Sequence, residues 1–318
     1  MDTAEVRPGA IVEPQARSGG RILGVGIATV DIVNLVSAYP VEDSEVRALD
    51  QRIVRGGNVT NTLSVLRQLG RPCAWTGTLA DDAGAALIAA DLDRHGIARE
   101  HAVTVTGART PTSYIALSQA TASRTIVHYR DLREFDAQDF AQLPLDGLDW
   151  VHFEGRNPGE TAAMIARVRR ERPQLPVSVE IEKRRTGIEQ LFGGPTLLIF
   201  SRAYVEAVEP GPTVDPRQFL RTLEAACTAE CLLLPWGAGG AYGLARGGEP
   251  VFAPACPPPV LVDTLGAGDC FNAAVIDGRL AGLDLLTLLA RANRIAGHKC
   301  GRDGLDGVIA SAKRAGLR

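Results

Sequence analysis

The chain has 318 residues, of which 45% are hydrophobic, and this size and composition allow one large α/β domain with a substantial core. Its net charge is only -3 and its pI is near 6.0, so the basic surface that nucleic acid requires is absent. Six cysteines occur without a Cys-x-x-Cys pair, which disfavours a zinc site and indicates a reducing, cytoplasmic location. No apolar run is long enough to span a membrane, and we expect no membrane contact.

The chain is predicted to begin with a leader and then to enter a sheet. Residues 1–20 are rich in Pro, Gly, Ala and charge without periodicity, which predicts disorder, and one domain is expected over residues 21–318. The buried-strand pattern of Ile22 to Ile27 ends near Asp31. Ligands of open α/β sheets bind outside the carboxyl ends of strands, so Asp31 is a candidate for polar contact; the alternative is a turn aspartate.

A small separate sheet is predicted to form a lid. Asn34 to Arg55 has no helical period, and together with the alternating segments Ser113–Leu117 and Arg124–Tyr129 it predicts insertions at about residues 32–55 and 110–131. Arg124 begins the last of these strands, where a plain surface arginine is the alternative. The exposed lid strands favour a homodimer in which two lids pair.

The run Arg55-Gly56-Gly57-Asn58 predicts a ligand contact at the start of a helix. Gly57 allows the backbone to approach a ligand, and Asn58 begins a helical pattern that ends at Gly70. Asn61 lies three residues after Asn58 and shares its face of the helix. Two amides there can bind hydroxyl groups, whereas an ordinary N-cap would explain Asn58 but not Asn61.

Strands alternate with helices through the middle of the chain, which predicts a parallel sheet with right-handed crossovers. Further along, Pro235 to Ala241 forms a glycine-rich loop after a strand. It contains neither a Walker A motif nor a dinucleotide fingerprint, so a loop over a nucleotide and a plain hairpin both remain open.

The run from Val262 to Asp269 is the most informative stretch. A β-branched strand end enters a glycine-rich corner, and the backbone amides of Gly266, Ala267 and Gly268 then meet the positive end of a helix dipole, which suits a phosphate. Asp269 falls in the first helical turn, where we expect the dipole to keep it ionised as a base for an acceptor hydroxyl. The alternative is a glycine-rich turn followed by an aspartate N-cap.

Asp263-Thr264-Leu265-Gly266-Ala267-Gly268-Asp269, followed by Phe271-Asn272-Ala273, resembles the signature of the ribokinase-like, PfkB-type carbohydrate kinases. The resemblance implies a three-layer, doubly wound, mostly parallel α/β sheet with a small β-sheet lid. It also implies that Asp269 is the catalytic base, that the three amides form an anion hole, and that Arg124 reaches the transferring phosphate. Asp31, Gly57, Asn58 and Asn61 would bind the sugar.

The same resemblance implies ATP and Mg²⁺, with K⁺ as a candidate further ion. The residues expected to bind the nucleotide are Gly237, Gly240, Pro257, Ala296 and Cys300. The Asn-x-x-Glu motif associated with magnesium in many members is absent, and Ser201-Arg202-Ala203-Tyr204 stands in its place, so the metal ligands are unassigned.

Several further segments resemble the ketohexokinase type of this family. They are Tyr39-Pro40, Glu42-Asp43-Ser44-Glu45, Glu154-Gly155-Arg156-Asn157, Val179-Glu180-Ile181-Glu182-Lys183, Pro257-Pro258-Pro259 and Gly304-Leu305-Asp306-Gly307. They imply transfer of the γ-phosphoryl group of ATP to a primary hydroxyl of a ketohexose, above all O1 of fructose. One departure is Ala238-Gly239, where that type carries an acidic pair, so nucleotide affinity is expected to differ.

Three alternatives remain open at the level of the sequence. The acceptor in the same family could be ribose, a nucleoside or 2-keto-3-deoxygluconate. A non-catalytic sugar- or nucleotide-binding regulator is disfavoured because it has no need of Asp269. A dinucleotide-dependent oxidoreductase is disfavoured because its fingerprint is missing.

Overall fold

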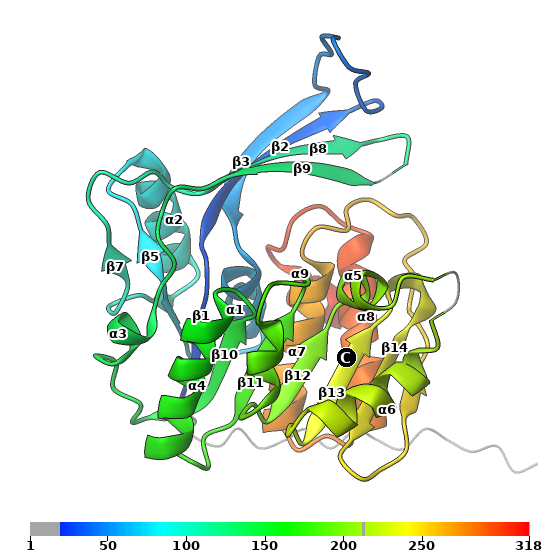
Figure 1. Ribbon diagram of the computed structural model, residues 1–318. Helices are drawn as coiled ribbons and strands as arrows, with labels where there is room; N and C mark the ends of the chain where they lie inside the picture. Colours follow the sequence, from blue (N-terminus) through cyan, green and yellow to red (C-terminus); the bar gives the residue numbers. More distant parts are fainter. Residues whose placement is uncertain (1–19, 122, 212–213, 318) are drawn as a thin grey trace, which may run out of the picture.

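The computed structural model describes residues 20–121, 123–211 and 214–317. A nine-stranded sheet forms the body of the molecule, and a four-stranded sheet projects above one edge of it as a lid (Figure 1). The leader expected over residues 1–20 lies, apart from Gly20, outside the described residues. Among the residues that are described, no helix is long and apolar enough to cross a membrane.

The large sheet has the strand order β15-β14-β13-β12-β11-β10-β1-β4-β6. Its strands are β1 (Arg21–Val25), β4 (Cys73–Thr76), β6 (Ile97–Ala98), β10 (Leu148–Glu154), β11 (Val177–Ile181), β12 (Leu197–Phe200), β13 (Cys231–Pro235), β14 (Ala241–Ala245) and β15 (Val251–Ala253). The neighbours from β13 to β6 are parallel, and β14 and β15 add an antiparallel edge. The reversal of strand order around β1 places the carboxyl ends of β1 and β10 beside each other at a switch point.

Helices cover both faces of this sheet, as its buried strands require. All five residues of β11 and all four of β12 are buried. One core lies under α1 (Asn58–Gln68), α2 (Ala83–Arg94), α7 (Ala267–Leu280), α8 (Leu285–Cys300) and α9 (Val308–Arg314). The other lies under α3 (Ala137–Phe140), α4 (Pro158–Glu171), α5 (Arg202–Val208) and α6 (Pro216–Ala226). The three layers confirm the predicted fold class.

The lid has the strand order β3-β2-β8-β9 and stands over the carboxyl ends of the large sheet (Figure 1). It is built from β2 (Thr29–Val36), β3 (Asp50–Gly56), β8 (Thr112–Ser118) and β9 (Arg124–Tyr129). The β2–β8 pair is parallel, and the other two pairs are antiparallel. Asp31, which the sequence placed after the first strand of the large sheet, lies inside β2 instead, because the chain leaves β1 at Val25 and enters the lid at Thr29.

The remaining elements are short. They are β5 (Thr78–Leu79) and β7 (Val103–Thr104), which pair with each other, and the single 3-10 turns η1 (Ile188–Phe192) and η2 (Gly237–Gly239). The N-cap of α2 is Asp82, whose side chain accepts from the amide of Ala85. The loop around η2 joins antiparallel neighbours, so the glycine-rich segment is a hairpin.

Candidate active site

The glycine-rich corner before α7 has the geometry of an anion-binding turn. Gly266 adopts a left-handed conformation with φ of 78°, and a Cβ there would come within 2.9 Å of the Leu305 side chain. A Cβ on Gly268 would meet no atom within 4 Å, so this backbone faces open space. The first amides of α7 have no partner within the helix, and the positive end of its dipole lies at the same point. The amides of Gly266, Ala267 and Gly268 are therefore brought together as predicted by the sequence.

Asp269 lies in the first turn of α7 and is almost fully buried. Its Oδ2 accepts a hydrogen bond of 2.8 Å from Nδ2 of Asn61. Burial, followed by the charge of Glu180 and smaller effects of Glu182 and Glu154, raises its pKa well above the ordinary aspartate value, although the Asn61 amide opposes this. The helix dipole alone would lower this pKa, so burial and the neighbouring carboxylates outweigh the effect on which the sequence-based expectation rested.

Asn61 is held in one orientation by Arg55, the last charged residue of lid strand β3. Arg55 donates from one terminal nitrogen to Oδ1 of Asn61 at 3.0 Å and from the other to Oγ of Ser64 at 2.6 Å. Its Nε forms an ion pair with Asp91 of α2. Because the amide oxygen of Asn61 is occupied, its nitrogen must be the atom that faces Asp269.

Two buried glutamates support the start of α1. Asn58 donates from Nδ2 to Oε2 of Glu180 at 3.0 Å. Glu154 accepts from the amide of Val59 at 2.9 Å and from that of Ile27 at 3.4 Å. Burial raises the pKa of both glutamates to about 7. Glu154 is the last residue of β10 and Glu180 the second last of β11, so these carboxylates bring the start of α1 to the carboxyl edge of the sheet.

Asp31 and the glycine pair before α1 pack closely together where β2 begins and β3 ends. A Cβ on Gly56 would lie 2.1 Å from Oδ2 of Asp31, and Gly57 has φ of 109° with a Cβ position 2.2 Å from the carbonyl oxygen of Ile27. Only glycine fits at either position. Thr29 donates to Oδ1 of Asp31 at 2.8 Å, and burial raises the pKa of Asp31. Asp31 thus faces the start of α1, as a sugar contact requires.

Arg124 reaches the glycine-rich corner from the lid. Its NH1 donates to Oγ1 of Thr264 at 3.0 Å, although 140 residues separate them. A plain surface arginine does not account for this contact. The exposed guanidinium of Arg124 lies beside the first residues of the anion-binding turn. A guanidinium there can stabilise charge on a phosphoryl group.

The residues predicted for the nucleotide lie in η2 and at its end, in the loop that follows β15, and on α8. Gly240 has φ of 90°, and a Cβ on it would lie 2.4 Å from the carbonyl oxygen of Ala253. Gly297, next to Ala296, approaches the chain before Pro257 so closely that a Cβ would lie 1.8 Å from the carbonyl oxygen of Cys256. The carbonyl oxygen of Cys300 accepts from the amides of residues 262 and 263, so the end of α8 holds the segment that leads into the turn. This segment is an irregular loop and not the strand end that the sequence predicted, because its amides bond to α8 instead of to a neighbouring strand.

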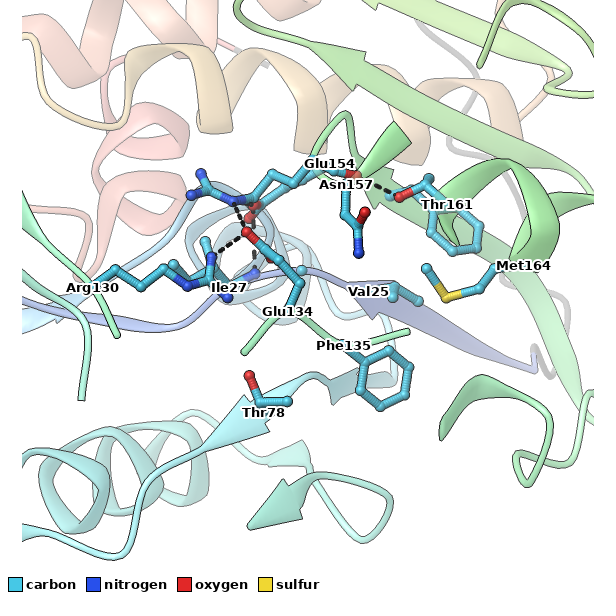
Figure 2. A pocket seen from close by; sticks show the side chains of 13 residues that line it. Val25, Ile27, Thr78, Arg130, Glu134, Phe135, Glu154, Asn157, Thr161 and Met164 are labelled. Atoms are coloured by element: carbon cyan, nitrogen blue, oxygen red, sulfur yellow. Dashed lines mark hydrogen bonds and ion pairs between the residues drawn. The ribbon is translucent and has the colours of Figure 1, made fainter. Parts of the chain in front are cut away.

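A small cavity opens beside Glu154 at the carboxyl ends of β1 and β10. Figure 2 shows Arg130, Glu134 and Glu154 on one side of it and Phe135 and Met164 on the other. Its volume of about 20 Å³ is room for a water molecule. The cavity is therefore too small to hold a second substrate.

Sequence reasoning left several residues of this site out of its candidates. In the sequence Arg55, Glu154 and Glu180 stand out only as parts of longer motifs, and no individual role is predicted for them. The two glutamates could have been recognised in the sequence because each is a charged residue at a buried position of a strand. Among the described residues, no group of three or more His, Cys, Asp or Glu side chains is arranged to hold a metal ion.

Comparison with known proteins places this geometry in a family. The model of the pfkB family carbohydrate kinases matches residues 21–310. The chain is 36% identical to mouse ketohexokinase over 297 residues, which cover 91% of this chain and 99% of that protein. It is 25% identical to the ATP-dependent ribose-1-phosphate kinase of Halopiger xanaduensis over 89% of this chain and 93% of that protein. The structure of Arabidopsis thaliana ribokinase complexed with ribose and ATP matches with a TM-score of 0.74 at 19% identity, over 92% of this chain and 98% of that one.

A doubly wound sheet with a lid, and a buried carboxylate beside a glycine-rich helix start, are the parts that transfer of a phosphoryl group to a hydroxyl group requires. The match of the pfkB family model over residues 21–310 identifies the acceptor as a carbohydrate. The chain belongs to the pfkB family of carbohydrate kinases, and it is an ATP-dependent sugar kinase of the ketohexokinase-like type.

Proposed function

We propose that this kinase phosphorylates a primary hydroxyl of a ketohexose and that its substrate is fructose, which it converts to fructose 1-phosphate. The observation that carries the proposal is the pairing of Asn61 with Asp269 at the anion-binding turn, beside Asn58. The identity of 36% to mouse ketohexokinase along nearly the whole chain supports the choice of acceptor. Asp31, Gly57, Asn58 and Asn61 would hold the sugar.

In this proposal Asp269 takes the proton of the acceptor hydroxyl as the sugar oxygen attacks the γ-phosphorus of ATP. The new P–O bond forms as the bond to the β-phosphate oxygen breaks, and ADP leaves. The amides of Gly266, Ala267 and Gly268 stabilise the charge on the γ-phosphoryl oxygens, and Arg124 adds a positive charge from the lid. A closed lid would exclude water, which otherwise competes as acceptor.

Magnesium fits the electrostatics of the site. Glu180, Glu182 and Glu154 all raise the pKa of Asp269, which marks a surplus of negative charge that a cation offsets. Mg²⁺ commonly binds through substrate phosphates, waters and one or two carboxylates, so the ion would enter with ATP and neutralise phosphate charge there. Glu180 and Glu182 would be the candidate carboxylates of this chain for such an ion. A potassium ion stays a prediction.

The outer face of the lid supports a homodimer. The register of the lid strands places Ile53, Ile32, Tyr114 and Val127 in one row across the sheet. Ile53, Tyr114 and Val127 are between 50% and 66% exposed, which is unusual for a row of large apolar side chains. We infer that a second copy of the lid covers this row. All six cysteines are free, which supports the cytoplasmic location.

A different acceptor is the second candidate. The similarity to a ribose-1-phosphate kinase, at 25% identity, makes ribose derivatives the alternative acceptors for this chain. The fold and the mechanism would be the same, and only the contacts that surround the sugar would differ.

The test is ATP turnover by the purified protein with Mg²⁺ across fructose, ribose, adenosine and 2-keto-3-deoxygluconate, with Asp269→Asn as the control. We expect turnover with fructose that disappears in the variant. Turnover with another of these acceptors would keep the mechanism and replace the substrate. No turnover with any of them, despite saturable ATP binding, would contradict the proposal and favour a regulator.

A further inference from the structure

Asp263, the first residue of the anion-turn motif, joins several parts of the chain through one buried carboxylate. Its Oδ1 accepts from the amide of Leu265 at 2.8 Å, and its Oδ2 accepts from Nζ of Lys299 at 3.1 Å. The Lys299 ammonium group also donates to the carbonyl oxygens of Asp263 at 2.8 Å and of Arg302 at 3.2 Å. The Asp263 and Lys299 side chains are 1% and 0% exposed. A buried ion pair whose hydrogen bonds are satisfied fixes the local backbone strongly.

The same carboxylate is also bound by the lid. Arg52, in the middle of β3, donates from NH2 to Oδ2 of Asp263 at 3.0 Å and also forms an ion pair with Asp303. Arg52 belongs to the lid and Asp263, 211 residues later, belongs to the body. This contact therefore exists only when the lid lies over the body. Burial of Asp263 alone would raise its pKa, but the charges of Lys299 and Arg52 and the Leu265 amide lower it. Asp263 is therefore a charged acceptor for the arginine.

An apolar contact also joins the lid to the anion-binding turn. The inner face of the lid carries a small cluster of Val33, Ile115 and Leu117, and Leu265 packs against it. Leu265 is the residue whose amide Asp263 holds, and it directly precedes Gly266. The anion-binding turn therefore contacts the lid at three points, by the side chain of Leu265, by the carboxylate of Asp263 and by the Thr264 hydroxyl that accepts from Arg124.

Beside these contacts the lid and the body are not closely packed. A groove with a volume of about 360 Å³ separates them. It is lined by Val33, Leu35, Arg52 and Leu117 from the lid and by Leu261, Val262 and Asp303 from the body. The Arg52–Asp263 contact crosses the edge of this groove and is the polar link between lid and turn on that side.

We propose that Arg52 is a positioning residue which couples the lid to the anion-binding turn through Asp263. When the sugar draws the lid onto the body through Asp31, Arg52 tightens its contact with Asp263, and Asp263 in turn orders the Leu265 amide and the turn that receives the γ-phosphate. The sugar and ATP sites then assist each other, and the coupling is reciprocal. The coupling between the two ligands rests on the proposed sugar kinase function, whereas the link between lid and turn does not.

The first experiment needs no ligand. Amide hydrogen exchange of residues 263–268 is compared in the wild type, in Arg52→Met and in Arg99→Met. Arg99 is a matched control, because it also donates two hydrogen bonds to an aspartate, Asp93, at a surface remote from the turn. We expect faster exchange over residues 263–268 in Arg52→Met alone. Arg52→Lys keeps one charged donor and should restore part of the protection. Exchange in folded Arg52→Met that equals the wild type would overturn the proposal.

The second experiment measures the coupling. The Kd of a non-hydrolysable ATP analogue with Mg²⁺ is measured with and without fructose. In the wild type and in Arg99→Met we expect fructose to tighten binding roughly five-fold or more, and we expect most of this effect to be lost in Arg52→Met. Coupling that survives in Arg52→Met would refute the positioning role. If the wild type does not phosphorylate fructose, the proposed function fails, and the exchange experiment still decides the link.

Discussion

Asn61 donates from Nδ2 to Oδ2 of Asp269 at 2.8 Å, and Arg55 occupies the amide oxygen of the same Asn61 at 3.0 Å. The amide therefore offers only its donor to the carboxylate. One oxygen of Asp269 is taken by this bond, and the other is left for the proton of an acceptor hydroxyl. The lid strand β3, the first helix and the glycine-rich turn before α7 thus meet at one carboxyl group, which is the proposed catalytic base.

The first prediction concerns Asp269→Asn. An amide of the same shape cannot accept the hydroxyl proton, so we expect kcat to fall roughly 10²–10⁴-fold, about 3–5 kcal/mol of barrier. The melting temperature should not fall, because the buried carboxyl is itself destabilised by its neighbours. Steady-state kinetics and a thermal melt on the same preparation test both statements. Near-normal turnover would remove Asp269 from the role of base.

The second prediction concerns Asn58→Ala. Asn58 lies at the start of α1 and is proposed to hold the sugar before and during transfer, so its loss should raise the KM for fructose more than it lowers kcat. The KM for ATP is the internal control and should change little. If the fructose KM stays at the wild-type value, the sugar binds elsewhere.

The sequence predicted much of this site because its signals are local. The run Gly57 to Asn61 and the run Gly266 to Asp269 each contain both the backbone geometry and the functional side chain within a few residues. The contacts of Arg55 and of Asp263 were not predictable in the same way. Their partners come from other elements, and no pattern in a single sequence pairs an arginine with an aspartate 211 residues away.

The direction of the pKa shift of Asp269 was also beyond the sequence. A helix N-terminus favours a charged carboxylate, and this local rule alone predicts a lowered pKa. The opposing effect comes from Glu180, Glu182 and Glu154, which reach the site from β11, the segment after it and β10. Which strands end beside α7 is decided by the strand order of the sheet, and that order is a property of the whole fold.

The third prediction concerns the pH dependence of turnover. Asp269 must be ionised to act as a base, and its pKa is raised first by burial and then by Glu180. The kcat profile should therefore rise with pH through an apparent pKa well above the ordinary aspartate value. Glu180→Gln removes the neighbouring charge and should shift this limb to lower pH, whereas the exposed Glu206→Gln should not. A limb that does not move in Glu180→Gln would contradict the assigned coupling.

The fourth prediction concerns stability. Burial raises the pKa of Glu154 from 4.5 to about 7 in the folded protein, so the folded state binds a proton that the unfolded state releases. Its contribution is fully present below the unfolded value of 4.5 and is lost as pH rises through about 7, by about 1.4 kcal/mol per pH unit between the two. Urea unfolding across this window should show Glu154→Gln gaining stability relative to the wild type as pH rises. The exposed Glu209→Gln is the control, and a parallel pH dependence in Glu154→Gln and wild type would rule the effect out.

The fifth prediction concerns the proposed lid dimer. Val127 is 66% exposed at the end of the apolar row on the outer face of the lid, so Val127→Lys places a charge where a second copy should pack. A desolvated, unpaired charge in an interface is strongly unfavourable, and we expect the variant to sediment as a monomer where the wild type sediments as a dimer. Val208→Lys introduces the same charge at an exposed valine of α5, in the body, and should leave the dimer intact. A Val127→Lys protein that remains dimeric at the same concentrations would show that the copies meet through another surface. If the variant is a folded monomer with a raised KM for the sugar, the pairing of lids also serves to hold each lid over its own active site.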